Sequence, residues 1–86
     1  MEPYQVILSP IVTEAVFDQI ELHNKIVFYV HLKANKNHIR LAFTALFDVI
    51  PIKINTSVTP KGKKKAFIKL PKDVIALDLA TDFGMF

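Results

Sequence analysis

The sequence lacks cysteine altogether, so the fold cannot depend on a disulfide framework or on a thiolate metal site. Only two glycines are present, too few for a glycine-rich phosphate loop, and the Pro-Lys-Gly-Lys run at residues 60–63 lacks the Walker spacing. The histidines His23, His31 and His38 match no recognised spacing of metal ligands. These absences predict a chain that holds no metal and no cofactor.

Long apolar runs are missing too. No segment approaches the ~20 consecutive apolar residues that cross a bilayer, and the first three residues lack the basic start of a signal peptide. The composition is otherwise ordinary for a globular protein, because 51% of the residues are apolar and 22% are charged. We therefore expect one soluble, intracellular domain that occupies residues 1–86 and has no membrane span.

Charge is strongly segregated along the chain. Residues 1–24 hold four acidic residues and no lysine or arginine, and residues 73–86 hold three acids and no lysine or arginine. Residues 25–72 hold all eleven lysines and arginines against the single Asp48, a net charge of +10 in a chain whose total is +3. Uneven charge also arises by chance in small proteins, but a block of this size favours a surface that faces RNA or another polyanion.

The pattern of apolar residues predicts four strands and three helices in the order β-α-β-α-β-β-α. Thr13 and Asn35 are good N-caps for the first two helices, and Gly84 is placed to end the last one. The strands are expected at about residues 4–8, 25–32, 50–55 and 66–70, and the helices at about 14–23, 36–47 and 74–83. Each helix has one apolar stripe to bury, which predicts an α+β fold with helices packed on one sheet.

Six lysines lie within twelve residues around the predicted hairpin of the last two strands: Lys61, Lys63, Lys64, Lys65, Lys69 and Lys72. Ammonium groups on a hairpin tip can neutralise several backbone phosphates of a nucleic acid. The alternative is that they only protect exposed strands from aggregation. Three consecutive lysines after the turn favour the binding interpretation.

The second predicted helix adds a separate indication. Lys33 and Lys36 flank its N-cap, and Arg40 follows one turn later. Cations near a helix N-terminus are mildly unfavourable, but a phosphate held by these side chains and by free backbone N–H groups would reverse that effect. The alternative is that exposed, flexible lysines hardly experience the helix dipole.

Five of the aromatic residues fall into two groups. Phe28, Phe43 and Phe47 have the spacing of core residues. Tyr29 and Phe67 fall on the opposite strand faces and could either pack or stack on bases. The sequence has no RNA-recognition-motif signature, so sequence-specific reading of single-stranded RNA on the sheet is not expected.

Two other function classes remain open. Glu14, Asp18 and Glu21 share one face of the first predicted helix, so the chain could be a protein-docking module that needs no RNA. A small phosphate-hydrolysing enzyme would have to rely on Arg40, the only arginine. No catalytic constellation accompanies Arg40, and we do not expect an enzyme.

A series of short motifs, in order along nearly the whole chain, resembles the ribosomal protein L23 family. The motifs are Pro10-Ile-Val-Thr13-Glu14, Asn24-Lys25-Ile-Val-Phe28, Ala34-Asn35-Lys36, Leu46-Phe47-Asp48-Val49, Ile54-Asn55-Thr56, Lys64-Lys65-Ala66-Phe67-Ile68-Lys69-Leu70 and Ala76-Leu77-Asp78-Leu79-Ala80. The short connection at residues 59–62 resembles archaeal and eukaryotic members. The absence of a long basic N-terminal extension favours the archaeal type.

The resemblance implies a four-stranded antiparallel sheet with packed helices and a place in the large ribosomal subunit in the cytoplasm, beside the peptide exit tunnel. The implied partners are large-subunit rRNA, neighbouring ribosomal proteins, and nascent-chain chaperones or targeting factors. The implied rRNA contacts are Lys33, Lys36, Arg40, Lys53, Asn55, Thr56, Lys61, Lys63, Lys64 and Lys65. Glu14 matches the glutamate of the family's factor-docking motif, although Ala15 replaces the lysine that normally follows, and Asp18 shares its helix face.

Overall fold

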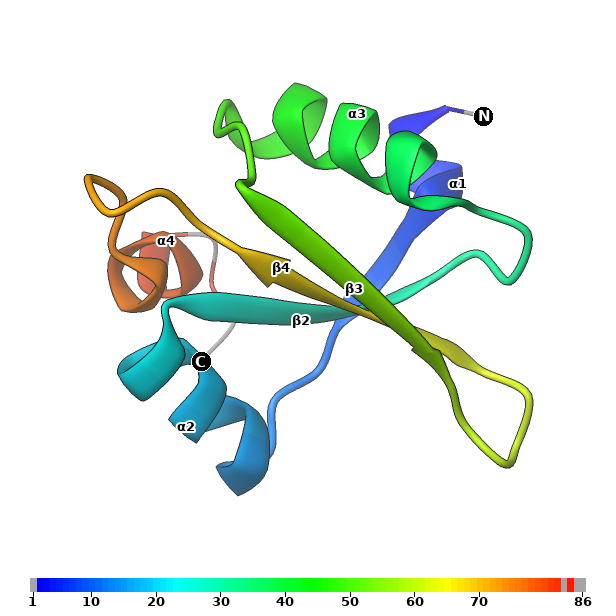
Figure 1. The fold of residues 1–86 in the computed structure, drawn as a ribbon, viewed down its shortest axis with the longest axis horizontal. Coiled ribbons are helices and arrows are strands. Elements are labelled where there is room, and N and C mark those ends of the chain that lie inside the picture. The colour runs from blue at the N-terminus through cyan, green and yellow to red at the C-terminus, as the bar shows by residue number, and fades with distance from the viewer. Residues whose placement is uncertain (1, 83, 85–86) are drawn as a thin grey trace.

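A computed structural model describes residues 2–82 and 84 of the chain. Within them, helices and strands follow one another as α1 (Pro3–Val6), β1 (Ile7–Pro10), α2 (Glu14–His23), β2 (Lys25–Val30), α3 (Lys36–Phe47), β3 (Lys53–Val58), β4 (Lys64–Lys69) and α4 (Ala76–Asp82) (Figure 1). The strands form one sheet in the order β1-β2-β4-β3, and every neighbouring pair is antiparallel. The α+β class and the four-stranded antiparallel sheet are therefore confirmed.

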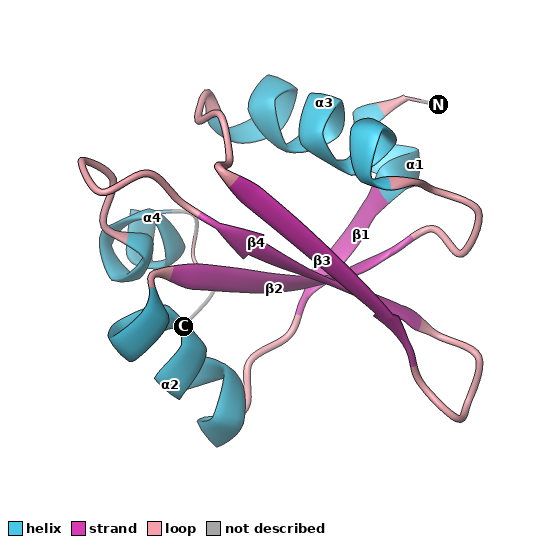
Figure 2. Ribbon diagram, in the orientation of Figure 1, coloured by secondary structure: helices cyan, strands magenta, loops and turns pink. Residues whose placement is uncertain are grey.

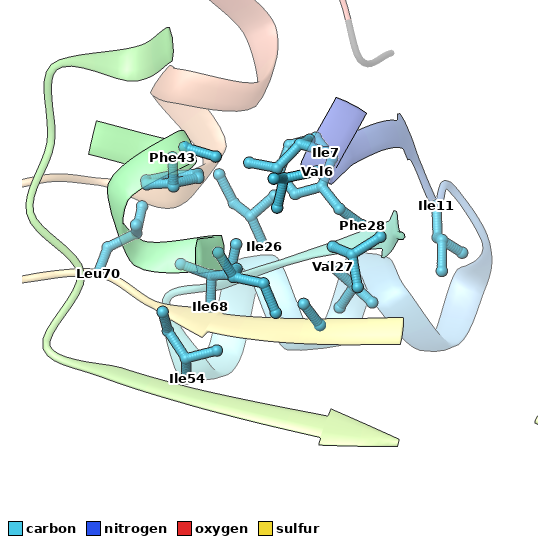
Figure 3. Packing of buried hydrophobic residues seen from close by; sticks show 14 of the residues in the cluster. Val6, Ile7, Ile11, Ile26, Val27, Phe28, Phe43, Ile54, Ile68 and Leu70 are labelled. Atoms are coloured by element: carbon cyan, nitrogen blue, oxygen red, sulfur yellow. The ribbon is translucent and has the colours of Figure 1, made fainter. Parts of the chain in front are cut away.

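The sheet has helices on both faces (Figure 2). On one face, α3 packs over β2, where the ring of Phe28 lies 6.2 Å from that of Phe43 and 5.6 Å from that of Phe47. On the other face, α2 covers the buried Val27. Alternate side chains of a strand point to opposite faces, so β2 needs apolar residues on both, as Figure 3 shows for Val27 and Phe28.

Local capping explains where the two longer helices begin. The Thr13 hydroxyl accepts a hydrogen bond from the Val16 N–H at 3.2 Å. The Asn35 side chain accepts one from the His38 N–H at 2.8 Å, and His38 Nδ1 accepts one from the Asn35 N–H at 3.2 Å. These bonds satisfy N–H groups that have no partner inside the helix, so the two predicted N-caps are confirmed.

The first predicted strand was wrong over residues 4–6, which form the one-turn helix α1. Pro3 occupies the first helical position, where a missing N–H costs nothing, and Gln5 Oε1 accepts a hydrogen bond from the Glu2 N–H at 3.0 Å. The strand β1 begins only at Ile7, and its pairing with β2 is irregular between Ile7 and Ser9. The alternation of apolar residues that suggested a strand therefore crosses two different elements.

The third predicted strand began too early. Ile50 and Ile52 are 59% and 61% exposed and lie in the connection before β3, where Pro51 cannot donate to a sheet. The last helix begins at Ala76 rather than near residue 74, and the predicted end at Phe83 lies outside the described residues. The Gly84 backbone is left-handed, with φ +68°, as expected of a residue after a helix.

Candidate nucleic-acid interface

Three of the predicted RNA-binding residues line one hollow between α3 and β3. Lys36 and Arg40 come from α3 and Lys53 from the start of β3, around an open depression of about 270 Å³. All three are exposed. A guanidinium fork beside two ammonium groups suits phosphate oxygens, since arginine can bind them in a bidentate manner and lysine adds charge.

The N-terminus of α3 offers fewer free backbone N–H groups to a phosphate than the sequence suggested. The His38 N–H already donates to the Asn35 side chain, and the Asn35 N–H donates to His38 Nδ1. Two of the amides near the helix start are thus occupied by the cap. A phosphate in this hollow would depend mainly on the side chains of Lys36 and Arg40.

The turn between β3 and β4 holds the basic tip in a fixed shape. The Thr59 N–H donates to the Lys63 carbonyl at 2.7 Å, and the Thr59 hydroxyl accepts a bond from the Lys63 N–H at 3.1 Å. Gly62 has φ +83°, a conformation that favours glycine. The exposed side chains of Lys61 and Lys63 therefore project from a closed, well-defined turn.

Lys64 and Lys65 point to opposite faces of the sheet, as neighbours on a strand must. Lys64 Nζ donates to the Ala34 carbonyl at 2.6 Å, which ties β4 to the loop that carries Lys33. Lys65 lies on the other face, opposite Tyr29 of β2 and Ser57 of β3. The hairpin tip and the start of α3 are therefore neighbours in space although 30 residues separate them in sequence.

We name the predicted cations together the basic band: Lys33, Lys36, Arg40, Lys53, Lys61, Lys63, Lys64 and Lys65. Figure 1 shows the hairpin tip and the loop before α3 at one end of the molecule, and α4 at the other. Within the described part of the chain, no ion pair joins a band residue to a carboxylate. The band keeps its charge available for a partner.

The two polar residues predicted to contact RNA, Asn55 and Thr56, lie on different faces of the sheet. Asn55 is exposed on the same sheet face as Lys65, whereas Thr56 is half-buried on the face of Ile54. Only Asn55 is therefore exposed on the same sheet face as Lys53. Glu14 and Asp18, the predicted docking residues, are both exposed on α2, away from the hairpin tip.

Sequence reasoning missed a row of three lysines across the sheet. Lys25 on β2, Lys69 on β4 and Lys53 on β3 lie opposite one another. Like charges at such positions repel, and the Lys69 ammonium is partly compensated by donating to the His23 carbonyl at the end of α2, at 2.9 Å. The row depends on the register of three strands, which no local motif reveals.

The described residues also bear on two other kinds of structure, a metal centre and a membrane helix. Within residues 2–82 and 84, no three histidine or acidic side chains are grouped so that they could hold a metal ion. In the same residues, no helix has the length and apolar character needed to cross a membrane.

Comparison with known proteins decides the family. The model of the family described as "Ribosomal protein L23" matches residues 5–76. The chain belongs to the ribosomal protein L23 family. This confirms the family resemblance, and because L23 proteins are structural components without enzymatic activity, it removes the hydrolase built on Arg40.

Two L23 relatives illustrate the breadth of the similarity. The large ribosomal subunit protein uL23 of Methanococcus maripaludis (strain C7) is 46% identical over the full length of both chains. The protein uL23A of Schizosaccharomyces pombe is 48% identical over 84 residues, which are 98% of this chain and 60% of the yeast protein. The chain thus matches an archaeal L23 from end to end but spans only about three fifths of the yeast L23.

Proposed function

We propose that the chain is a structural component of the large ribosomal subunit, in the cytoplasm, that binds large-subunit rRNA beside the peptide exit tunnel through the basic band. The observation that carries the proposal is the Lys64–Ala34 contact, which places the hairpin tip beside the loop before α3, the helix that supplies Lys36 and Arg40 to the hollow. The names of the relatives, which are large-subunit proteins, support the ribosomal role. Other ribosomal proteins would then be its neighbours.

Phosphate recognition explains why the band is built mostly from lysine. A folded RNA presents closely spaced phosphates along grooves and junctions, and each neutralised phosphate releases condensed counterions. Such a partner needs point charges spread over a surface rather than one deep pocket. The absence of paired carboxylates along the described band keeps those charges uncompensated in the free protein.

Salt dependence tests this proposal directly. Binding to large-subunit rRNA of Methanococcus maripaludis, measured by filter binding at several salt concentrations, should weaken steeply as salt rises. Each neutralised phosphate contributes a slope of about −0.9 in log K against log salt for duplex nucleic acid. We expect a slope that corresponds to at least about three phosphates, and a shallower slope would contradict rRNA binding by the band.

A second proposed role uses the acidic helix α2. Glu14 and Asp18 are exposed there, and the partly exposed Phe17 lies on the same helix. A negatively charged surface is poorly suited to RNA and well suited to the basic or amphipathic surface of a nascent-chain chaperone or targeting factor. This protein face would remain accessible while the basic band is bound to rRNA.

Glu14→Ala combined with Asp18→Ala should reduce cosedimentation of nascent-chain factors with ribosomes, because it removes two charges from the docking surface. Binding of the variant to rRNA should change by less than about threefold, since neither residue belongs to the band. Glu2→Ala, outside α2, serves as a control. Unchanged association of factors with ribosomes that carry the double variant would contradict this role.

A further inference from the structure

The ring of Tyr29 lies where the edge of the core meets the basic residues of the hairpin. A hollow of about 420 Å³ beside the hairpin turn is lined by Tyr29, Thr59, Pro60, Lys61, Lys63 and Lys65. Lys63 Nζ lies over the ring, 5.1 Å from its centroid. Tyr29 thus presents an aromatic surface within a cluster of three ammonium groups.

Tyr29 packs against the core but is less buried than its neighbour on the strand. Its neighbour Phe28 is 2% exposed and contacts the rings of α3, whereas Tyr29 is only half-buried on the opposite face. Tyr29 also lines two further hollows, one toward β1 and Lys64 and one toward α2 and Phe67. The ring therefore packs on one side and remains accessible from several directions on the other.

The backbone fixes the position of the ring. Tyr29 pairs with Ser9 of β1 on one side and with Lys65 of β4 on the other, so its Cα is held by two antiparallel ladders. The hairpin turn is closed by hydrogen bonds between Thr59 and Lys63. An aromatic surface held in this way loses little freedom when a flat ligand stacks on it.

We propose that Tyr29 is a stacking platform for one unpaired base of an RNA, whose flanking phosphates are held by Lys61, Lys63 and Lys65. The inference rests on the proposed function, and adds that the hairpin tip binds an unpaired nucleotide as well as phosphates. The π face of the ring is negative, which explains why Lys63 occupies it in the free protein.

Exchange of the lysine for a base needs no rearrangement of the backbone. An exposed cation–π contact is weak, and the Lys63 ammonium gains a phosphate when it leaves the ring. Stacking of a base on an aromatic side chain is stronger than an exposed cation–π contact and tolerates any base. The absence of an RNA-recognition-motif signature fits a single stacking platform that reads no sequence.

Fluorescence tests the stacking step alone. The chain has two tyrosines and no tryptophan, so Tyr4→Phe leaves Tyr29 as the only strong intrinsic fluorophore. A single-stranded oligoadenylate should quench this emission, after correction for absorption by the bases. The quenching should reach a plateau as the oligoadenylate concentration rises. Unchanged emission at oligonucleotide concentrations that saturate binding would overturn the proposal.

Affinity for rRNA gives the second measurement. Tyr29→Phe keeps the ring and should bind large-subunit rRNA of Methanococcus maripaludis within about twofold of the unmodified chain. Tyr29→Leu keeps apolar volume but not the stacking surface, and should bind about tenfold more weakly with the same salt slope. Equal binding by a folded Tyr29→Leu chain would overturn the stacking platform and leave the proposed function intact. Absence of salt-dependent binding by the unmodified chain would instead contradict the proposed function.

Discussion

Replacing Arg40 and Lys53 together by glutamine is expected to weaken binding to large-subunit rRNA about a hundredfold near 0.1 M salt. Both side chains line the same hollow, and a hydrogen bond to a charged group contributes about 1.5–3 kcal/mol, whose lower value corresponds to roughly tenfold per contact. The slope of log K against log salt should also fall by about 2, since two phosphates are no longer neutralised. Filter binding across a salt series measures both quantities.

Lys72→Glu is the matched control for this double variant. It lowers the net charge by the same two units, but Lys72 is exposed in the connection before α4 and lies outside the basic band. Long-range attraction alone predicts equal losses of affinity for the control and the double variant. Local phosphate contacts predict a large loss only for Arg40→Gln with Lys53→Gln, so equal losses would contradict a binding role for the hollow.

The two longer helices could be predicted because their signals are local. Thr13 and Asn35 cap helices whose buried residues recur every three to four positions, and both caps form the expected hydrogen bonds. The strand β2 could be predicted too, because its β-branched and aromatic residues are typical of a strand. A sequence of this length encodes such elements without help from distant residues.

The ends of the sheet were harder to predict because two local patterns compete there. Apolar and polar residues alternate over residues 4–6 as in a strand. Pro3 and the Glu2–Gln5 hydrogen bond favour a helical turn, however, and this turn is what forms. Near β3, Ile50 and Ile52 alternate as well, although the edge strand itself is rich in polar residues. An edge strand that faces solvent has weak hydrophobic patterning, so its start is poorly specified.

Lysine-rich composition predicted the chemistry of the interface but not its connections. The Lys64–Ala34 bond, the Lys63–Tyr29 contact and the grouping of Arg40 with Lys53 join residues between 13 and 34 positions apart. Each depends on strand register or on helix packing, which periodicity alone does not fix. Tyr29 in particular could only be assigned to one strand face before its neighbours were known.

Asn24→Ala is expected to lower the free energy of unfolding by about 3–4 kcal/mol, from a total of roughly 4–13 kcal/mol for a domain of this size. The Asn24 amide donates to the Pro71 and Val74 carbonyls at 3.1 and 2.8 Å, and its oxygen accepts from the Ala76 N–H at 2.7 Å. Each bond contributes about 1 kcal/mol, and alanine is strained at φ +53°. The midpoint of thermal unfolding should fall by about 15–25 °C.

Asp48→Ala separates the backbone effect from the hydrogen bonds. Asp48 ends α3 as Asn24 ends α2, with a left-handed backbone at φ +55°, but it is exposed, and α3 leads into a loop rather than a buried junction. Its replacement should cost only about 1 kcal/mol, because strain is then the main loss. The loss in free energy of unfolding for Asn24→Gly should lie between these two values, because glycine avoids the backbone strain but cannot form the hydrogen bonds of the asparagine side chain. If Asn24→Ala and Asp48→Ala lower the free energy of unfolding in urea equally, the hydrogen bonds of the Asn24 side chain do not stabilise the junction of α2 with α4.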